Sequence, residues 1–229
     1  VLVADPAFAL EPEDADVAWA SLPPRPRVMF ALRPWPAPGN PEAAYARVIE
    51  RVCTELGAHV TLLAFQPETD LAMADRIADL CGAGGCVRPQ VVPFYGSPGQ
   101  ALSVIAQADL VVGMRLHSLI FAASAGVPAV AIDYDPKVRA MARRTGNAHV
   151  VPVDAQPEEM VRAVLDAWAQ RDELRSELAQ RVPDLKRLAR DAARLALMPI
   201  ADGPAKCGRA HVLGVPVDCV SMDEAVGRA

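Results

Sequence analysis

The sequence lacks several features that would assign a protein to a class at once. No apolar run reaches the roughly 18 residues that span a bilayer, and the longest runs are interrupted by Arg115 and His117. The five cysteines form no Cys-x-x-Cys pair and the four histidines lie far apart, which disfavours structural zinc and a disulfide framework. A Walker A loop, a Gly-x-Ser-x-Gly motif and a carboxylate cluster for metal are missing as well. We therefore expect reduced thiols, no metal and no cofactor.

Basic residues are fewer than acidic ones. The sequence contains 23 Lys and Arg residues and 28 Asp and Glu residues, which gives a net charge of −5. This balance argues against a general nucleic-acid-binding surface. A hydrophobic content of 52% and a charged content of 22% are typical of globular proteins and exclude wholesale disorder. The 229 residues suffice for one large domain, or for one domain with pieces of others.

Proline and glycine mark the expected domain boundaries. We expect residues 1–10 to form a strand that ends a truncated N-terminal domain, and the acidic, Pro-rich residues 11–26 to form a linker. Residues 199–210 predict a second linker. Residues 211–229 predict a strand over 211–217 and then a helix capped by Ser221, which would begin another truncated domain. Because the first residue is Val, we expect the chain to be a segment of a longer protein.

Residues 27–198 alternate between short apolar segments and amphipathic ones. Six strands, each followed by a helix, predict βαβ units with right-handed crossovers. The expected fold is therefore α/β, a Rossmann-like parallel sheet with helices on both faces. The expected strands span 28–32, 59–65, 87–94, 109–114, 128–133 and 149–153, and the expected helices span 41–57, 69–81, 97–108, 116–125, 136–145, 157–181 and 183–197.

The densest set of chemical groups follows the fourth expected strand. Ligands of such sheets bind beyond the carboxyl ends of the strands, and Arg115, Leu116, His117 and Ser118 stand there, at the start of a helix. The first-turn N–H groups favour an anion, Arg115 offers a fork for carboxylate or phosphate, and His117 can move a proton near neutral pH. The alternative is that Arg115 forms a salt bridge at a sheet edge and that His117 packs on the helix.

Arg33 and Lys137 follow two other expected strands. If the first and fourth strands are neighbours, Arg33 and Arg115 converge, and two arginines with a helix N-terminus suit a small ligand with two anionic groups. Lys137 lies in the first turn of its helix and faces the same cleft, where it can meet a phosphate. The alternatives are a surface loop cation for Arg33 and a solvated side chain for Lys137. We expect Trp35 to act as a lid or packing residue, and Asp135 as a helix N-cap.

The residues around this cleft carry a resemblance to a known family. The blocks that carry it are residues 4–10, 32–35, 108–123, 126–128 and 134–138. They resemble the bacterial polysaccharide pyruvyltransferase family, with residues 4–10 similar to the end of its N-terminal domain and the others to its C-terminal domain. The resemblance extends to about residue 195, and its most specific part is the Arg-Leu-His block at 115–117.

The resemblance implies a two-domain, GT-B-like enzyme of which residues 27–198 are the C-terminal catalytic domain. It implies transfer of the enolpyruvyl carbons of phosphoenolpyruvate to two hydroxyls of a sugar, with formation of a pyruvate ketal and release of phosphate. His117, as acid or base, and Arg115 would be catalytic. The donor phosphoenolpyruvate would be bound by Arg33, Arg115, Leu116, His117, Ser118 and Lys137. The acceptor would be a cell-wall polysaccharide or lipid-linked sugar of the N-acetylmannosamine type.

A second and shorter resemblance lies in the tail. Residues 212–218 and 221–225 resemble the start of the WecG/TagA/CpsF family of glycosyltransferases, which transfer N-acetylmannosamine-type sugars to a lipid-linked acceptor. The two activities belong to one pathway, so we expect a fused polypeptide.

The sequence is also compatible with two other functions. A GT-B glycosyltransferase with a nucleotide-sugar donor would place a pair of carboxylates near the fourth and fifth strands to hold a ribose. A non-catalytic sugar- or nucleotide-binding module would tolerate replacement of His117. For the preferred function we expect phosphoenolpyruvate and a sugar acceptor as partners, no nucleic acid and no integral membrane segment. We expect a cytoplasmic location, and leave open peripheral contact with the inner face of the membrane.

Overall fold

The computed structural model describes residues 4–15, 25–36, 40–83, 87–147, 149–197, 210–212 and 215–217. Its centre is a six-stranded sheet with the strand order β3-β2-β1-β4-β5-β6, in which every neighbouring pair is parallel. The predicted fold, an α/β Rossmann-like sheet with helices on both faces, is confirmed. The sheet strands are β1 (Arg27–Ala31), β2 (His59–Ala64), β3 (Gln90–Pro93), β4 (Leu110–Gly113), β5 (Ala129–Asp133) and β6 (Val150–Pro152).

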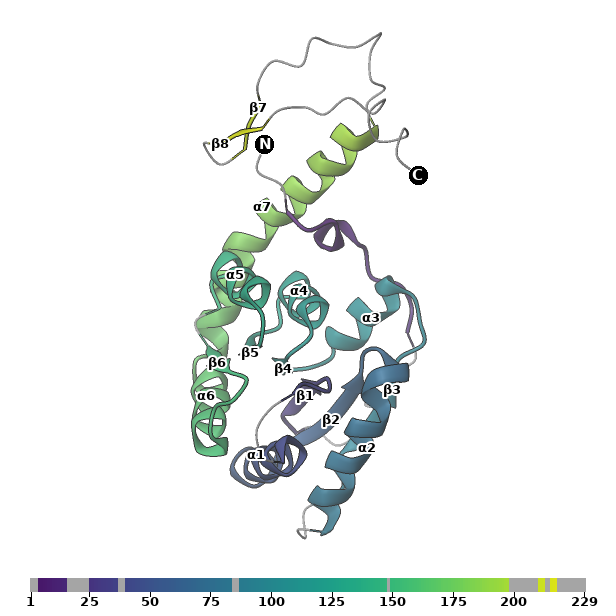
Figure 1. The fold of residues 1–229 in the computed structure, drawn as a ribbon, viewed down its shortest axis with the longest axis vertical. Helices are drawn as coiled ribbons and strands as arrows, with labels where there is room; N and C mark the ends of the chain where they lie inside the picture. The colour runs from purple at the N-terminus through teal and green to yellow at the C-terminus, as the bar shows by residue number, and fades with distance from the viewer. Residues whose placement is uncertain are drawn as a thin grey trace, which may run out of the picture.

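Two layers of helices cover the sheet (Figure 1). The helices are α1 (Pro41–Leu56), α2 (Pro67–Ala83), α3 (Pro98–Ile105), α4 (Leu116–Ser124), α5 (Pro136–Thr145), α6 (Pro157–Ala169) and α7 (Arg171–Leu197). Helices α1, α2 and α6 enclose one apolar core, and α3, α4, α5 and most of α7 enclose the other. Because both faces of the sheet are covered, the central strand β4 is apolar throughout, and its Leu110, Val111 and Val112 are fully buried.

Local sequence determines where several helices begin and end. The side chain of Asp135 accepts a hydrogen bond from the N–H of Lys137 at 2.9 Å, which confirms it as the N-cap of α5. Gly57 and Gly146 end α1 and α5 in the left-handed region, with φ of 60° and 78°. Glycine adopts this conformation without a steric penalty from Cβ, and both predicted ends are confirmed.

The expected strand at the start of the chain is wrong for residues 4–10. These residues contain a 3₁₀ turn, η1 (Pro6–Ala9), which Asp5 caps by accepting a hydrogen bond from the N–H of Ala7 at 2.9 Å. Pro6 cannot donate to a strand ladder, and its fixed φ suits the first position of a helical turn. Phe8 is 1% exposed and packs into the core under α4 and α7. The division of the chain into domains stays a prediction.

Part of the predicted linker at 11–26 lies on the α/β domain. The N–H of Glu13 donates to the carbonyl of Gly99 at 3.2 Å, and the hydroxyl of Ser97 donates to the carboxylate of Glu13 at 2.6 Å. Residues 11–15 therefore follow the beginning of α3, while residues 16–24 lie outside the described part of the chain.

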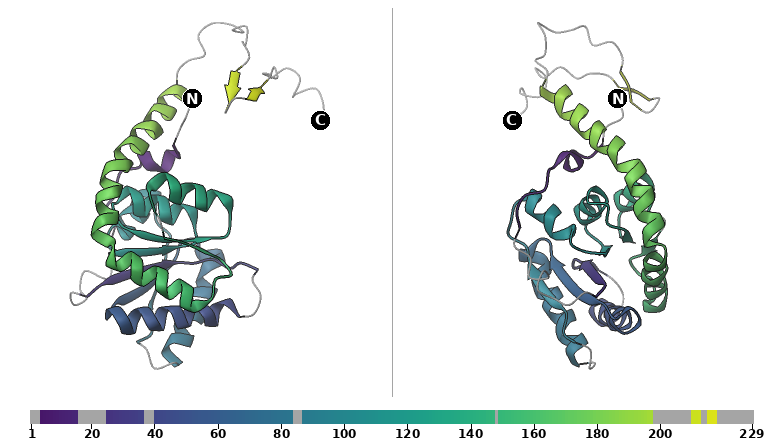
Figure 2. Two further views of the ribbon diagram at one scale, coloured as in Figure 1. Left: turned by 90° about the vertical axis from the view of Figure 1, so that its left-hand side faces the viewer. Right: turned by 180° about the vertical axis from the view of Figure 1, so that it is seen from behind.

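Two helix predictions need correction. Helix α2 begins at Pro67 and not at Thr69, since Pro is well suited to the first helical position. The predicted break at Pro183 is also wrong, because Pro183 lies inside α7 and the chain breaks at Gln170. The reason is tertiary: Leu174 still packs in the core of α6, whereas Leu178 packs in the core on the other side of the sheet. Figure 2 shows how α7 then continues along the molecule towards η1.

The tail contains a hairpin where one strand was expected. Strands β7 (Ala210–Val212) and β8 (Val215–Val217) pair antiparallel, so the predicted strand over 211–217 is wrong. A Gly-containing pair of residues between two short apolar runs is a hairpin signal, and Leu213-Gly214 provides one. The helix predicted from Ser221 lies outside the described residues. In the part of the chain that the structure describes, no helix is long and apolar enough to cross a membrane.

Candidate functional site

The sheet brings Arg33 and Arg115 to the same edge. Strands β1 and β4 are neighbours, and Ala31 lies opposite Gly113, so the two arginines follow at equivalent positions. From β1 the chain builds the sheet outward through β2 and β3, and it returns to the other side of β1 with β4. The carboxyl ends of β1 and β4 therefore form the topological switch point, where sheets of this kind bind ligands.

A cavity of about 350 Å³ lies at this edge and is called here the cationic cavity. Its walls are formed by Arg33, Phe65, Gln66, Arg115, Leu116, His117, Tyr134 and Lys137. Of the residues that the sequence predicts for phosphoenolpyruvate, all except Ser118 line it. The charged side chains of this lining are all basic, because it contains Arg33, Arg115 and Lys137 and neither Asp nor Glu.

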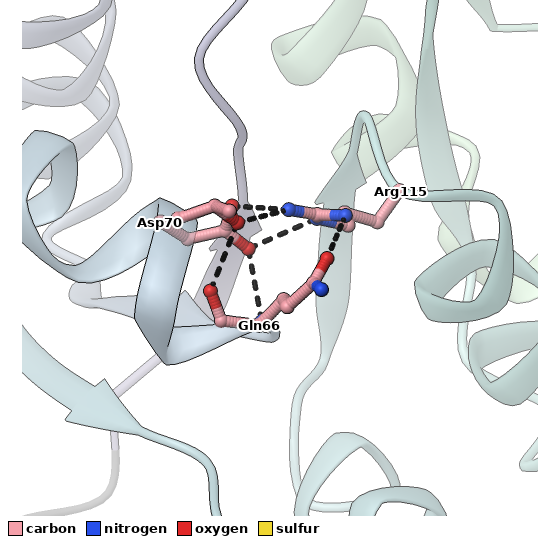
Figure 3. Close-up of polar contacts among 4 residues, drawn as sticks. Gln66, Asp70 and Arg115 are labelled. Atoms are coloured by element: carbon pink, nitrogen blue, oxygen red, sulfur yellow. Dashed lines mark hydrogen bonds and ion pairs between the residues drawn. The ribbon is translucent and has the colours of Figure 1, made fainter.

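Arg115 is held in place by the beginning of α2 (Figure 3). Its Nε donates to Oδ2 of Asp70 at 2.9 Å, and its Nη2 forms an ion pair with Oδ1 of the same carboxylate. Nη1 donates to Oε1 of Gln66 at 2.9 Å, and Nη2 donates to the hydroxyl of Thr69 at 2.8 Å. A guanidinium has five N–H donors, so one N–H, on Nη1, is left without an acceptor among the described residues.

The partner carboxylate is the part of the site that sequence reasoning missed. The side chain of Asp70 is 1% exposed, and it also accepts hydrogen bonds from the N–H of Gln66 at 3.0 Å and the hydroxyl of Thr69 at 2.9 Å. A buried carboxylate needs such partners because desolvation of the charge is costly. The sequence offered only a weak signal, an acidic residue in the first turn of α2. The alternative of an ion-paired Arg115 is thus correct, although its partner lies on α2 and not on a sheet edge.

Arg33 has no such partner. Its guanidinium carbon lies 5.8 Å from the ring centre of Trp35 and 5.4 Å from that of Tyr134, and these two rings meet edge to face at 4.7 Å. Within the described residues no carboxylate pairs with Arg33, and its buried Nε has no hydrogen-bond acceptor. An unsatisfied buried donor is unfavourable. The aromatic rings therefore hold a cation that lacks an anion. Trp35 acts as a packing residue here, as predicted.

The first turn of α4 provides backbone donors and the imidazole. The N–H groups of Leu116 and His117 have no acceptor among the described residues, and they carry the partial positive charge of the helix N-terminus. The His117 side chain is exposed, with its ring centre 6.2 Å from that of Phe121. Ser118 differs from the other predicted residues: its side chain is fully buried and its hydroxyl donates to the carbonyl of Arg115 at 2.6 Å.

Lys137 reaches the cavity from α5, and two carboxylates lie near it. Its Nζ lies 3.7 Å from the carboxylate of Asp135, which caps the helix. The carboxylate of Asp133, at the end of β5, accepts a hydrogen bond from Nε of Arg139 at 2.7 Å. Asp133 is therefore engaged by Arg139, whereas the second oxygen of Asp135 lies beside Lys137. In the described residues no group of three or more His, Cys, Asp or Glu side chains is placed to hold a metal ion.

These features define a Rossmann-like domain with basic side chains gathered at its switch point, and solved structures share the fold. An O-GlcNAc transferase mutant from Thermobaculum terrenum is 18% identical, with a TM-score of 0.54 over 82% of this chain and 40% of its own. A protein from Listeria monocytogenes described as a UDP-N-acetylglucosamine 2-epimerase is 13% identical, with a TM-score of 0.61 over 88% of this chain and 54% of its own. A trehalose 6-phosphate synthase from Burkholderia multivorans is 14% identical, with a TM-score of 0.53 over 77% and 43%.

This chain spans about half or less of the length of these proteins, and identities this low show the fold alone. The sequence itself is more informative. A profile of the polysaccharide pyruvyl transferase family matches residues 1–136, which is more than half of the 229 residues. The chain belongs to the polysaccharide pyruvyl transferase family. No curated protein matched the sequence.

Proposed function

We propose that the cationic cavity binds phosphoenolpyruvate, and that the protein transfers its three carbons to two hydroxyls of a saccharide as a ketal. Membership of the family supports the reaction class. The choice of phosphoenolpyruvate as the donor substrate rests on one observation. The unpaired guanidinium of Arg33 lines the same cavity as the fixed guanidinium of Arg115. Phosphoenolpyruvate has a carboxylate and a phosphate, so it needs two separate sets of positive or donor groups.

The carboxylate and the phosphate of phosphoenolpyruvate would bind to different groups in the cavity. Arg33 offers a guanidinium without a carboxylate partner, and such groups bind carboxylate or phosphate with two parallel hydrogen bonds. The free N–H of Arg115 and the amides of Leu116 and His117 form the second set at the start of α4. Lys137 adds a positive charge at the rim. Asp70 keeps Arg115 in one orientation, so the second set is preorganised before the ligand arrives.

The reaction needs proton transfer and stabilisation of positive charge on the carbon. A proton is added to the methylene carbon, the oxygen of the first acceptor hydroxyl bonds to C2, and the bond from C2 to the phosphate oxygen breaks. The second hydroxyl oxygen then bonds to C2 and completes the ketal. The two hydroxyl protons end on the new methyl group and on the released phosphate, so atoms and charge balance. His117 is the side chain of the cavity that can carry these protons near neutral pH.

The acceptor follows from the resemblance and not from the cavity. We infer a cell-wall polysaccharide or lipid-linked sugar of the N-acetylmannosamine type, modified on the cytoplasmic side of the membrane. A nucleotide-sugar donor is disfavoured, because Asp133 is paired with Arg139 and the oxygen of Asp135 that does not cap α5 lies beside Lys137. The tail would join this activity to that of a WecG/TagA/CpsF-type glycosyltransferase.

Titration calorimetry of the full-length protein tests whether phosphoenolpyruvate is the donor substrate. Phosphoenolpyruvate is expected to bind, whereas UDP-N-acetylglucosamine is not. Inorganic phosphate and pyruvate, each with one of the two anionic groups, should bind more weakly than phosphoenolpyruvate. Tighter binding of the nucleotide sugar than of phosphoenolpyruvate would overturn the proposal.

A further inference from the structure

A second pocket adjoins the cationic cavity and has the opposite charge. Its volume is about 720 Å³, and we call it the acidic pocket. Its walls contain four aromatic rings and two carboxylates, and it shares three residues with the cationic cavity. The rings are Phe65, Phe94, Tyr95 and Phe121, the carboxylates are Asp5 and Glu68, and the shared residues are Phe65, Gln66 and His117.

The charges of the cationic cavity and the acidic pocket favour different ligands, an anion in the first and a neutral molecule in the second. The lining of the acidic pocket contains neither Arg nor Lys, whereas the charged lining of the cationic cavity is all basic. The exposed carboxylate of Glu68 has no partner among the described residues. One oxygen of Asp5 accepts the N–H of Ala7, which leaves the other available. An anion is repelled by such walls, and a neutral ligand rich in hydroxyls is not.

The remaining groups suit a sugar ring. Tyr95 lines the acidic pocket and is 74% exposed, so its ring is open to a ligand. A pyranose has an apolar face of C–H groups that can lie on such a ring, and its hydroxyls donate to carboxylates. Nε2 of Gln66 provides a donor, because only its Oε1 is used by Arg115. Aromatic walls with a few polar groups are typical of small-molecule sites, and the volume lies in their range.

We propose that the acidic pocket binds a neutral sugar residue of the acceptor saccharide. This inference rests on the proposed function, since it assigns the second substrate of the same reaction. Its basis is the position of His117, which lines both spaces. A hydroxyl held in the acidic pocket faces the imidazole from one side, and the C2 carbon of a donor in the cationic cavity lies on the other. His117 can then take the hydroxyl proton as the oxygen bonds to C2.

Two substitutions test the pocket without affecting the donor site. Tyr95→Ala removes an exposed ring, and Glu68→Gln removes an exposed charge, so neither should unfold the protein. Glu158→Gln is the matched control for Glu68→Gln: both residues are exposed and directly follow the proline that begins a helix, Pro67 of α2 and Pro157 of α6. The probes are the methyl glycosides of N-acetylmannosamine, N-acetylglucosamine and glucose, with methyl glucuronide as an anionic comparison.

Ligand-observed NMR with the full-length protein gives the readout. We expect at least one neutral glycoside to bind more tightly than the glucuronide. Its dissociation constant should rise about tenfold or more in Tyr95→Ala and in Glu68→Gln, because each substitution removes one or two hydrogen bonds or an equivalent contact. In Glu158→Gln the dissociation constant should stay unchanged. Phosphoenolpyruvate affinity should stay within twofold in all three variants.

The outcomes separate this inference from the proposed function. If phosphoenolpyruvate binds and no neutral glycoside does, or if Tyr95→Ala and Glu68→Gln leave glycoside binding unchanged, the acidic pocket is not the acceptor site and the donor proposal stands. If glycosides bind through Tyr95 and Glu68 while phosphoenolpyruvate does not bind at all, the sugar site stands and the proposed donor is wrong. Tighter binding of the glucuronide than of the neutral glycosides would overturn the charge argument.

Discussion

The guanidinium of Arg115, at the start of α4, is ion-paired with the carboxylate of Asp70, in the first turn of α2. The two residues are 45 positions apart in the sequence, and their side chains are 14% and 1% exposed. This pair fixes the orientation of the arginine and balances most of its charge. Of the two arginines at the switch point, Arg115 is therefore a positioned donor and Arg33 is the available cation.

The first prediction concerns the stability of this pair. Asp70→Asn should lower the free energy of unfolding by about 3 kcal/mol, because it leaves a largely buried guanidinium without its counter-charge. Urea unfolding followed by circular dichroism measures this change. Asp75→Asn is the control, since Asp75 forms an ion pair with Arg88 in which both side chains are about half exposed, and its loss should cost less than about 1 kcal/mol. Equal effects of the two substitutions would show that the Arg115–Asp70 pair is not structural.

The second prediction separates the two arginines. Arg33→Ala should weaken phosphoenolpyruvate binding by about 10- to 100-fold, the loss of one charge-assisted partner, and change stability little. Arg115→Ala should weaken binding and also lower the melting temperature, because the Asp70 carboxylate is then buried without its partner. Arg33→Lys keeps the charge but not the fork, so we expect intermediate affinity. Calorimetry and thermal unfolding of each variant measure the two effects. Unchanged affinity in Arg33→Ala would remove this residue from the donor site.

The third prediction concerns proton transfer. His117→Gln should leave phosphoenolpyruvate affinity within a few-fold and slow ketal formation by about 10²–10⁴, the usual contribution of a general acid or base. Stability should not change, because the side chain is exposed. Phosphate release by the full-length protein with acceptor present measures the rate. A turnover rate equal to that of the unmodified protein would show that His117 carries no proton in the reaction.

The fourth prediction is a pH dependence of stability from a residue remote from the site. Burial raises the pKa of Tyr45 in α1 from 10.0 to about 12. Below pH 10 the phenol is neutral in both states, so its contribution to stability is fully present. Between pH 10 and 12 the unfolded chain ionises first, and stability is lost as pH rises, by up to about 2–3 kcal/mol for a shift of this size. Tyr45→Phe should show a smaller loss between pH 9 and 12 in urea titrations. An identical loss in both proteins would contradict the prediction.

Most of the fold was predictable because it depends on local signals. Apolar runs alternating with amphipathic segments predict parallel βαβ units, and glycines such as Gly57 and Gly146 predict helix ends that the structure has. The exceptions depend on distant contacts. Phe8 makes the first described residues part of the domain core, and α7 passes through Pro183 because it packs on both α5 and η1.

The sequence by itself determined which residues meet at the carboxyl edge of the sheet. Parallel strands place their ends together, so Arg33, Arg115 and Lys137 line one cavity as the strand pattern predicts. Only the tertiary structure decided what each one does there. Asp70 comes from a helix that is distant in sequence, and it binds Arg115 through a contact that no local pattern encodes. The charge of the acidic pocket likewise depends on η1, α2 and α4 lining one space, because charge and burial are properties of packed surfaces and not of single segments.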